Sequence, residues 1–268
     1  MLGIQAPLLT TVPGVSHRFF SRIGGTSPKP WAMLNTSFDV GDSPARVQEN
    51  LARVRFQIGV RKDALYSATQ VHGTDVIVVR GDEDCEELRA AQADGIVTVA
   101  PHVAVAVRTA DCAPILLAVD DGSGVGALHA GWRGAVHGMV QSGVAALCRE
   151  AAVSASRLVA AIGPTIGMKA FEVGPEVIAA ARAVSDIDGL WVPSSESARA
   201  DRAHLDLSGF VERLLRQAGV ERVERVGSCT VTHTDVYFSH RKEDGVTGRQ
   251  MSVIARTEPP RLDDEALA

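Results

Sequence analysis

Residues 103–134, VAVAVRTADCAPILLAVDDGSGVGALHAGWRG, decide the fold class. This stretch contains three short apolar runs rich in β-branched residues, at 103–107, 115–119 and 125–128. Runs of this length and composition are typical of buried strands. The links between them are too short for a helical crossover, which needs about a dozen residues. The sequence therefore predicts sheets that are mixed rather than purely parallel.

Helical and strand patterns alternate on both sides of this stretch. Ser43 followed by Pro44 is typical of a helix start, and apolar residues then recur at spacings of three and four up to about Ile58. Similar spacing predicts helices over 135–148, 175–184 and 207–218, and short apolar runs predict further strands over 76–79, 158–162, 223–226 and 251–255. The alternation favours the α/β class.

Composition excludes several classes of protein. The 268 residues carry a net charge of −5 and only 12 aromatic residues, so nucleic acid is not an expected partner. Four cysteines are too few for a disulfide scaffold, and no secretory leader pattern is present, so we expect a reducing cytoplasm. The apolar runs are far shorter than the roughly 20 residues that span a bilayer, so no membrane span is expected.

The chain contains no internal repeat and no low-complexity linker, which predicts a single domain over residues 1–256. The last residues, 257–268, contain two prolines and four acidic residues without apolar periodicity. This composition predicts a flexible tail.

Three segments place metal-competent residues at strand ends. They are QVHG at 70–73, ADCAP at 110–114 and LHAGWRG at 128–134. Side chains at strand ends are held by the sheet and can converge on one cleft, so His72, Cys112 and His129 are candidate ligands of one ion. Two imidazoles and a thiolate suit Zn²⁺ and leave a fourth position for water or substrate, as in catalytic zinc sites. The competing interpretation is a small buried cysteine and two hydrogen-bonded histidines, because 40 and 17 residues separate the three.

The other cysteines and several histidines carry no such pattern. Residues expected to be structural are Cys85, Cys148, Cys229, His102, His137 and His204.

Glycines beside arginines raise the possibility of anion binding. GWRG at 131–134 opens a predicted helix, whose free amides together with Arg133 could hold phosphate; alternatively, the glycines only permit a tight turn. The same two interpretations apply to Arg22 in SRIGGTS (21–27) and to Arg249 in TGRQ (247–250).

In this order, the motifs resemble those of the YfiH or laccase-domain family, formerly described as polyphenol oxidases and now associated with purine nucleoside phosphorylase and adenosine deaminase activity. The resemblance covers about 230 residues and is carried by His17, RIGG (22–25), LN (34–35), GD (41–42), EN (49–50), QVHG (70–73), ADG (93–95), TADCAP (109–114), HAGWRG (129–134), IGP (162–164), FEVG (171–174), FSHR (238–241) and TGR (247–249).

The resemblance implies a layered α/β/β/α fold and one catalytic Zn²⁺ held by His72, Cys112 and His129. It also implies phosphorolysis of adenosine, guanosine, inosine and methylthioadenosine, and hydrolytic deamination of adenosine. The expected small-molecule partners are therefore purine nucleosides and phosphate. Arg22 and the segment around Arg133 are our candidates for binding phosphate, and Asn35 and Gln70 for binding sugar or base. Many relatives have tyrosine where this chain has His240, so the role of the loop at 238–249 is open.

The residues leave three other functions to consider. Copper oxidation is disfavoured because none of the eight histidines forms the His-x-His pairs that a multicopper cluster needs. A zinc- or cysteine-dependent amidohydrolase, for example one that edits a peptidoglycan precursor, would use the metal or would use Cys112 as nucleophile with His129 or His72 as base. A metal-stabilised interaction protein would unfold when Cys112 is replaced by alanine.

Overall fold

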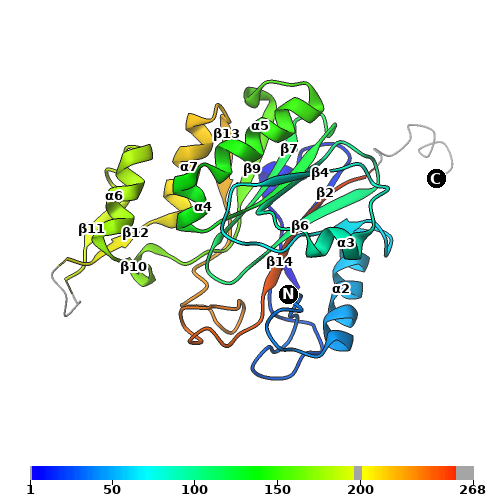
Figure 1. The fold of residues 1–268 in the computed structure, drawn as a ribbon, viewed down its shortest axis with the longest axis horizontal. Helices are drawn as coiled ribbons and strands as arrows, with labels where there is room; N and C mark the ends of the chain where they lie inside the picture. The colour runs from blue at the N-terminus through cyan, green and yellow to red at the C-terminus, as the bar shows by residue number, and fades with distance from the viewer. Residues whose placement is uncertain (1, 196–200, 258–268) are drawn as a thin grey trace.

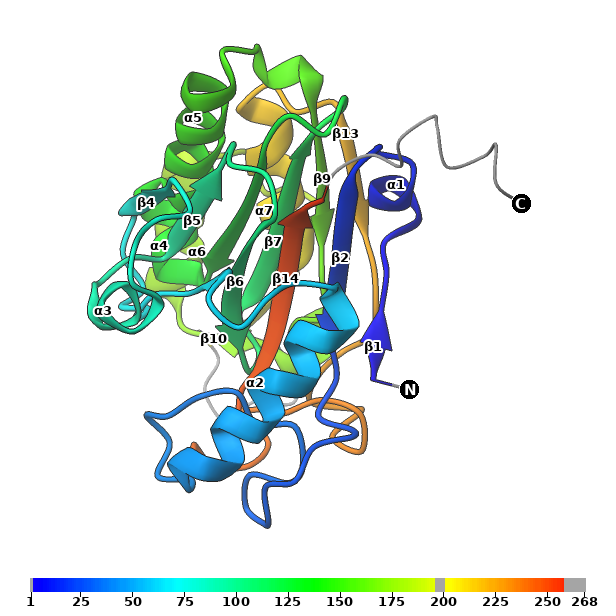
Figure 2. The ribbon, with the colours of Figure 1, turned by 90° about the vertical axis from the view of Figure 1, so that its right-hand side faces the viewer.

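Two mixed β-sheets packed face to face form the centre of the computed structural model, which describes residues 2–195 and 201–257 (Figures 1 and 2). The six-stranded sheet has the order β13-β9-β7-β8-β5-β4. Its strands are β4 (Val76–Val79), β5 (Gly95–Thr98), β7 (Ala113–Val119), β8 (Val125–Ala130), β9 (Leu158–Ile162) and β13 (Arg222–Arg225). The pairs β13/β9 and β4/β5 are parallel and the other three pairs are antiparallel. The predicted mixed sheet is confirmed.

The five-stranded sheet has the order β1-β2-β14-β6-β3. Its strands are β1 (Gly3–Ile4), β2 (Val15–Phe20), β3 (Leu65–Tyr66), β6 (Val103–Thr109) and β14 (Gln250–Arg256). Strand β14 pairs with β2 and β6 in antiparallel register, so the C-terminal strand lies in the middle of this sheet.

Helices cover the outer face of each sheet. Helix α2 (Pro44–Ile58) packs on the five-stranded sheet and crosses it in Figure 2. The six-stranded sheet is covered by α4 (Trp132–His137), α5 (Met139–Ala151) and α7 (Leu207–Gln217). The remaining elements are α1 (Pro7–Thr10), α3 (Cys85–Ala90), α6 (Pro175–Val184), η1 (Ala155–Arg157), η2 (Met168–Ala170) and a small sheet of β10 (Glu172–Val173), β12 (Ala203–Leu205) and β11 (Trp191–Pro193). Within the ranges described, no helix is long and apolar enough to cross a membrane.

The apolar core divides into three layers because the sheet residues alternate between two faces. In β6, Val105 and Val107 face the other sheet, whereas Ala104 and Ala106 face α2. Both faces are thus buried, which explains why these strands are continuously apolar in the sequence. The helix, sheet, sheet, helix order confirms the α/β/β/α fold that the resemblance implies.

The structure corrects one predicted helix and adds elements that the sequence pattern missed. The helix expected over 135–148 is two helices, because Gly138 adopts a left-handed φ of 103° and ends α4 before α5 begins. Helix α3 was missed although the Asp84 side chain caps it, accepting from the backbone N–H groups of Glu86 and Glu87. Strands β2 and β5 were also missed. The predicted tail beyond Thr257 lies outside the described residues.

His17 in β2 is buried and should make the fold sensitive to mild acid. Its Nε2 accepts from the backbone N–H of Ala6 at 2.8 Å, and the ring is 1% exposed. Burial lowers the pKa of His17 from 6.5 to about 4. The unfolded chain therefore binds the extra proton between these two values, and the free energy of unfolding should fall by about 3 kcal/mol as pH drops from 6.5 to 4.

Urea unfolding at several pH values checks this expectation. His17→Gln keeps an acceptor for the Ala6 N–H but does not titrate, so the difference in unfolding free energy between wild type and variant should change over this window. A constant difference would show that His17 does not contribute to acid sensitivity.

Candidate metal centre and adjoining cavity

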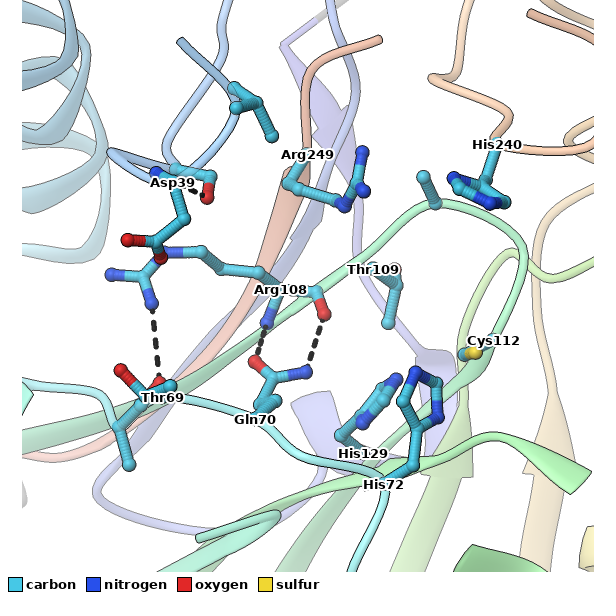
Figure 3. A pocket seen from close by; sticks show the side chains of 14 residues that line it. Asp39, Thr69, Gln70, His72, Arg108, Thr109, Cys112, His129, His240 and Arg249 are labelled. Atoms are coloured by element: carbon cyan, nitrogen blue, oxygen red, sulfur yellow. Dashed lines mark hydrogen bonds between the residues drawn. The ribbon is translucent and has the colours of Figure 1, made fainter. Parts of the chain in front are cut away.

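The structure brings His72, Cys112 and His129 together. One ligand atom from each lies within 4.8 Å of the other two. The two imidazole rings meet edge to face, with centroids 4.8 Å apart. The three residues come from the loop before β4, the turn between β6 and β7, and β8 (Figure 3). The fold therefore brings these strand ends together, as the sequence suggested.

The backbone before Cys112 is held in an unusual conformation by Asp111. This residue has a φ of 92°, a value that few residues other than glycine adopt. Its carboxylate accepts from the Thr230 hydroxyl at 2.5 Å and from the Arg241 backbone N–H at 2.6 Å, and its carbonyl accepts from the Thr165 hydroxyl at 2.5 Å. These contacts join the Cys112 turn to two distant loops and fix the direction of the thiol.

Asp94, which the sequence did not single out, binds the His129 ring and the backbone of the loop that carries His72. Its Oδ1 lies 2.7 Å from His129 Nδ1, which leaves His129 Nε2 free to bind a metal. Its carboxylate also accepts from the backbone N–H groups of Val71, His72 and Gly73 at 3.0, 3.1 and 2.7 Å. Asp94 is fully buried. One carboxylate thus orients one histidine and shapes the loop that carries the other.

Gly131 leaves the space that the cluster occupies. A Cβ at this position would lie 2.7 Å from His72 Nδ1 and 3.0 Å from Cys112 Sγ. No larger residue fits there without moving these side chains. The glycine of this motif is therefore explained by close approach to the cluster.

The charges in the cluster favour the form of cysteine that binds metals. Burial alone would raise the pKa of the Cys112 thiol, but the charge of His129 and hydrogen bonds with both imidazoles lower this pKa below its usual value. Burial alone would lower the pKa of His129, but the Cys112 thiolate and Asp94 raise it. Metal ligation requires the thiolate, and the cluster is arranged to hold one.

The donor set fits a zinc ion. Two imidazoles and one thiolate are borderline-soft ligands, and three protein ligands leave one tetrahedral position for water or substrate. The buried carboxylate on His129 is the partner that metal-bound histidines usually have. All four cysteines of the chain are free thiols, so Cys112 is not engaged in a disulfide.

A cavity of about 350 Å³ opens beside the cluster (Figure 3). It contains polar groups from both sheets and from the loops near residues 40 and 240. Its lining residues are Ser37, Asp39, Val40, Ala68, Thr69, Gln70, His72, Arg108, Thr109, Ala110, Cys112, His129, His240 and Arg249. The volume suits a small ligand. His240, whose role the sequence left open, is an exposed residue of this lining.

Of the four residues predicted to bind substrate, Gln70 lines the cavity. Its side-chain amide donates to the Arg108 carbonyl and accepts from the Arg108 N–H, both at 2.7 Å. This pair of bonds ties the loop before His72 to β6. Gln70 therefore shapes the wall of the cavity.

The other three lie outside the lining. Arg22 donates to the carbonyls of Ala32 and Thr234, both at 2.7 Å, and pairs with Glu243 at 3.0 Å. Asn35 is fully buried, and its amide binds Asp42 Oδ2 at 2.9 Å. Arg133 is exposed and stacks on Trp132. Arg22 joins distant loops through Thr234 and Glu243. Asn35 does the same through its Oδ1, which accepts from the Arg249 backbone N–H at 3.0 Å.

Replacing Arg22 by alanine should therefore destabilise the protein. The change leaves the carbonyls of Ala32 and Thr234 and Oε1 of Glu243 without the Arg22 donor, at a cost of about 2–4 kcal/mol. Thermal unfolding measures this, with the exposed Arg61→Ala as a control. A large rise in the KM for phosphate without a change in stability would instead support the anion-binding role that the glycine-rich context suggested.

Comparison with known proteins identifies the family of this chain. A sequence family described as multi-copper polyphenol oxidoreductase laccase matches residues 16–257. A protein of Deinococcus radiodurans named purine nucleoside phosphorylase is 39% identical over 251 residues, which are 94% of this chain and 91% of that protein. The chain belongs to the laccase-like YfiH family. Purine nucleoside phosphorylase YfiH of Escherichia coli is 34% identical over 90% of this chain and 93% of its own.

Solved structures of this family share the fold. Bacillus licheniformis YfiH superposes with a TM-score of 0.83 at 30% identity, covering 90% of this chain and 92% of that one. Geobacillus stearothermophilus YlmD gives a TM-score of 0.86 at 27% identity, covering 96% and 99%. The names of the curated relatives support an enzyme. The family description names copper, whereas the cluster found among residues 2–195 and 201–257 is one His-Cys-His set.

Proposed function

We propose that this chain is a zinc-dependent purine nucleoside phosphorylase that also deaminates adenosine and cleaves methylthioadenosine. The observation that carries the proposal is the convergence of His72, Cys112 and His129 on the wall of a cavity that also contains arginine side chains. The names of the relatives in Deinococcus radiodurans and Escherichia coli support the same activity. The free thiols of all four cysteines support a reducing, cytoplasmic location.

Phosphorolysis breaks the bond between C1′ of ribose and the purine nitrogen and forms a bond between C1′ and a phosphate oxygen. The electron pair of the broken bond leaves with the purine, and the proton of hydrogen phosphate ends on that base. The site must therefore hold an anion near the sugar and exclude competing water. A zinc ion bound by the cluster would supply Lewis acidity and would lower the pKa of a coordinated water.

The protein's own residues fix the orientation of the candidate metal-binding atoms and of the loops around the cavity. Asp94 keeps the Nδ1 proton of His129 in place, so that Nε2 points to the metal position. Gln70 and Asp111 hold the two loops that flank the cavity. Because these groups are bonded before substrate arrives, little reorganisation is needed during the reaction.

Product analysis tests the proposal. Purified protein of known zinc content is incubated with adenosine, with and without phosphate, and the products are separated by chromatography. Adenine and ribose 1-phosphate that form only with phosphate support phosphorolysis, and inosine formed without phosphate supports deamination. Absence of every product from adenosine, and from guanosine, inosine and methylthioadenosine tested in the same way, would contradict the proposal.

A second candidate is an amidohydrolase in which Cys112 is the nucleophile. It is favoured by the close approach of the thiol to two imidazoles, a pairing that also serves thiol catalysis. Chelation and alkylation distinguish the two candidates. Activity on an amide that survives complete metal removal and is lost on thiol alkylation would favour the cysteine mechanism; loss on chelation favours the metal.

A further inference from the structure

Thr109 presents a buried hydroxyl without a hydrogen-bond partner in the cavity wall. It is the last residue of β6, it is 2% exposed, and its Oγ1 finds no partner within the part of the chain that the structure describes. Such groups are rare in folded proteins because each unmet bond destabilises the native state. Thr109 lines the cavity, so a bound ligand can provide the missing acceptor.

The strand pattern places Thr109 beside the metal ligands. Thr109 follows Val105 and Val107 on the face of β6 that meets the other sheet, and His129 follows Ala127 on the facing side of β8. Both residues therefore stand where the core between the sheets ends and the cavity begins. Figure 3 shows Thr109 between Arg249 and His129 in this view.

Arg249 brings a positive charge to the same cavity. One terminal nitrogen, Nη1, donates to the carbonyls of Thr247 and Gly248 at 3.1 and 2.9 Å. Its other guanidinium nitrogens have no partner, and it forms no ion pair, among residues 2–195 and 201–257. Burial lowers its pKa, whereas the negative charges of Cys112 and Asp111 act in the opposite direction. A half-buried guanidinium that keeps free N–H donors and forms no direct ion pair with the described residues is suited to an anionic ligand.

Arg108 differs from Arg249 although both line the cavity. Its Nε donates to the Thr36 carbonyl and its Nη2 to the Ser67 hydroxyl, both at 2.8 Å, and the charge of Asp39 acts on it. Its donors are therefore used to hold loops. Thr109 and Gln250 are Cα partners in the β6/β14 ladder, so Arg249 is one residue from the position opposite Thr109.

We propose that Thr109 and Arg249 form the subsite for inorganic phosphate, the second substrate. The inference rests on the proposed phosphorylase function. A tetrahedral phosphate can accept the Thr109 O–H and the free N–H groups of the Arg249 fork from different oxygens. This subsite places the phosphate in the same cavity as the His72, Cys112 and His129 cluster. The alternatives suggested by the sequence are less suitable, because Arg22 is used between loops and helix α4 has only six residues.

Three variants test the subsite. Thr109→Val removes the hydroxyl at nearly constant volume, whereas Thr109→Ser keeps it. Arg249→Gln removes the positive charge. The exposed Arg46→Gln on α2 is the matched control for loss of one positive charge. Inorganic phosphate is titrated into each zinc-loaded protein by calorimetry, and the KM values for phosphate and for nucleoside are measured separately.

Thr109→Val and Arg249→Gln should each weaken phosphate binding about ten- to one-hundred-fold, with a smaller change in the KM for nucleoside. Thr109→Ser and Arg46→Gln should bind phosphate within about threefold of wild type. Thr109→Val should also raise the melting temperature of the phosphate-free protein by about 2–4 °C, because it removes an unmet hydroxyl. This second readout does not depend on catalysis.

The outcomes separate the subsite from the proposed function. Phosphate binding that is lost in Thr109→Val and Arg249→Gln, without phosphorolysis by wild type, would uphold the subsite and contradict the function. Phosphorolysis with an unchanged phosphate KM in both variants would overturn the subsite and uphold the function. Wild type that neither binds phosphate nor cleaves nucleosides would overturn both.

Discussion

Cys112→Ser should remove bound metal and lower phosphorolysis roughly a thousand-fold while leaving the protein folded. The thiolate is one of three protein donors in the cluster, and serine is a far weaker ligand for a borderline-soft ion. Loss of one donor also removes the negative charge that balances His129 in its buried position. Metal content by elemental analysis and product formation by chromatography measure the two effects.

Cys148→Ala is the matched control, because Cys148 is a half-buried thiol that packs against the core beneath α5. It should retain full metal content and activity. If Cys112→Ser instead unfolds, the metal has a structural role, as expected for a metal-stabilised interaction protein. If Cys112→Ser keeps both its metal and its activity, the cluster is not the reactive centre.

Asp94→Ala should lower the free energy of unfolding by about 3 kcal/mol and weaken zinc binding about ten- to one-hundred-fold. The carboxylate accepts from three consecutive backbone N–H groups and from His129 Nδ1, and alanine leaves all four without their acceptor. Burial alone would raise the pKa of Asp94, but the hydrogen bond from His129 and those from Gly73 and Val71 lower it. The native state therefore favours the ionised form.

The stability that Asp94 contributes depends on pH. Because its native pKa lies below the ordinary 3.8, its stabilising effect is complete above that value and is lost as pH falls through the native pKa. Asp94→Asn retains an acceptor for His129 and should be intermediate. Asp75→Ala removes an exposed carboxylate near the same loop and should leave stability and zinc affinity unchanged. Equal effects of Asp94→Ala and Asp75→Ala would contradict the positioning role.

The three candidate ligands could be found from sequence because each lies at the end of an apolar run. Strand ends are recognisable locally, and the sheet brings them together. Asp94 also precedes a strand, in the motif ADG at 93–95, but nothing local indicates that its carboxylate reaches back to residues 71–73. Its role depends on the pairing of β5 with β8, which is a tertiary property.

The substrate contacts were harder to predict for the same reason. An arginine beside glycines suggested anion binding at Arg22, yet carbonyls from residues 32 and 234 satisfy that guanidinium. Arg249 has a similar local sequence but keeps free donors in the cavity. The two arginines are distinguished by the hydrogen-bond acceptors that surround each guanidinium in the folded protein. Similarly, apolar spacing predicted one helix after Gly134, whereas the left-handed Gly138 divides it.

Zinc titration of metal-depleted protein tests the central claim most directly. Apo protein receives increasing zinc in the presence of adenosine and phosphate, and adenine formation is followed. We expect activity to be absent without metal, to rise in proportion to zinc and to level off at about one ion per chain. Full activity in metal-free protein, or activation by copper but not by zinc, would contradict a catalytic zinc held by His72, Cys112 and His129.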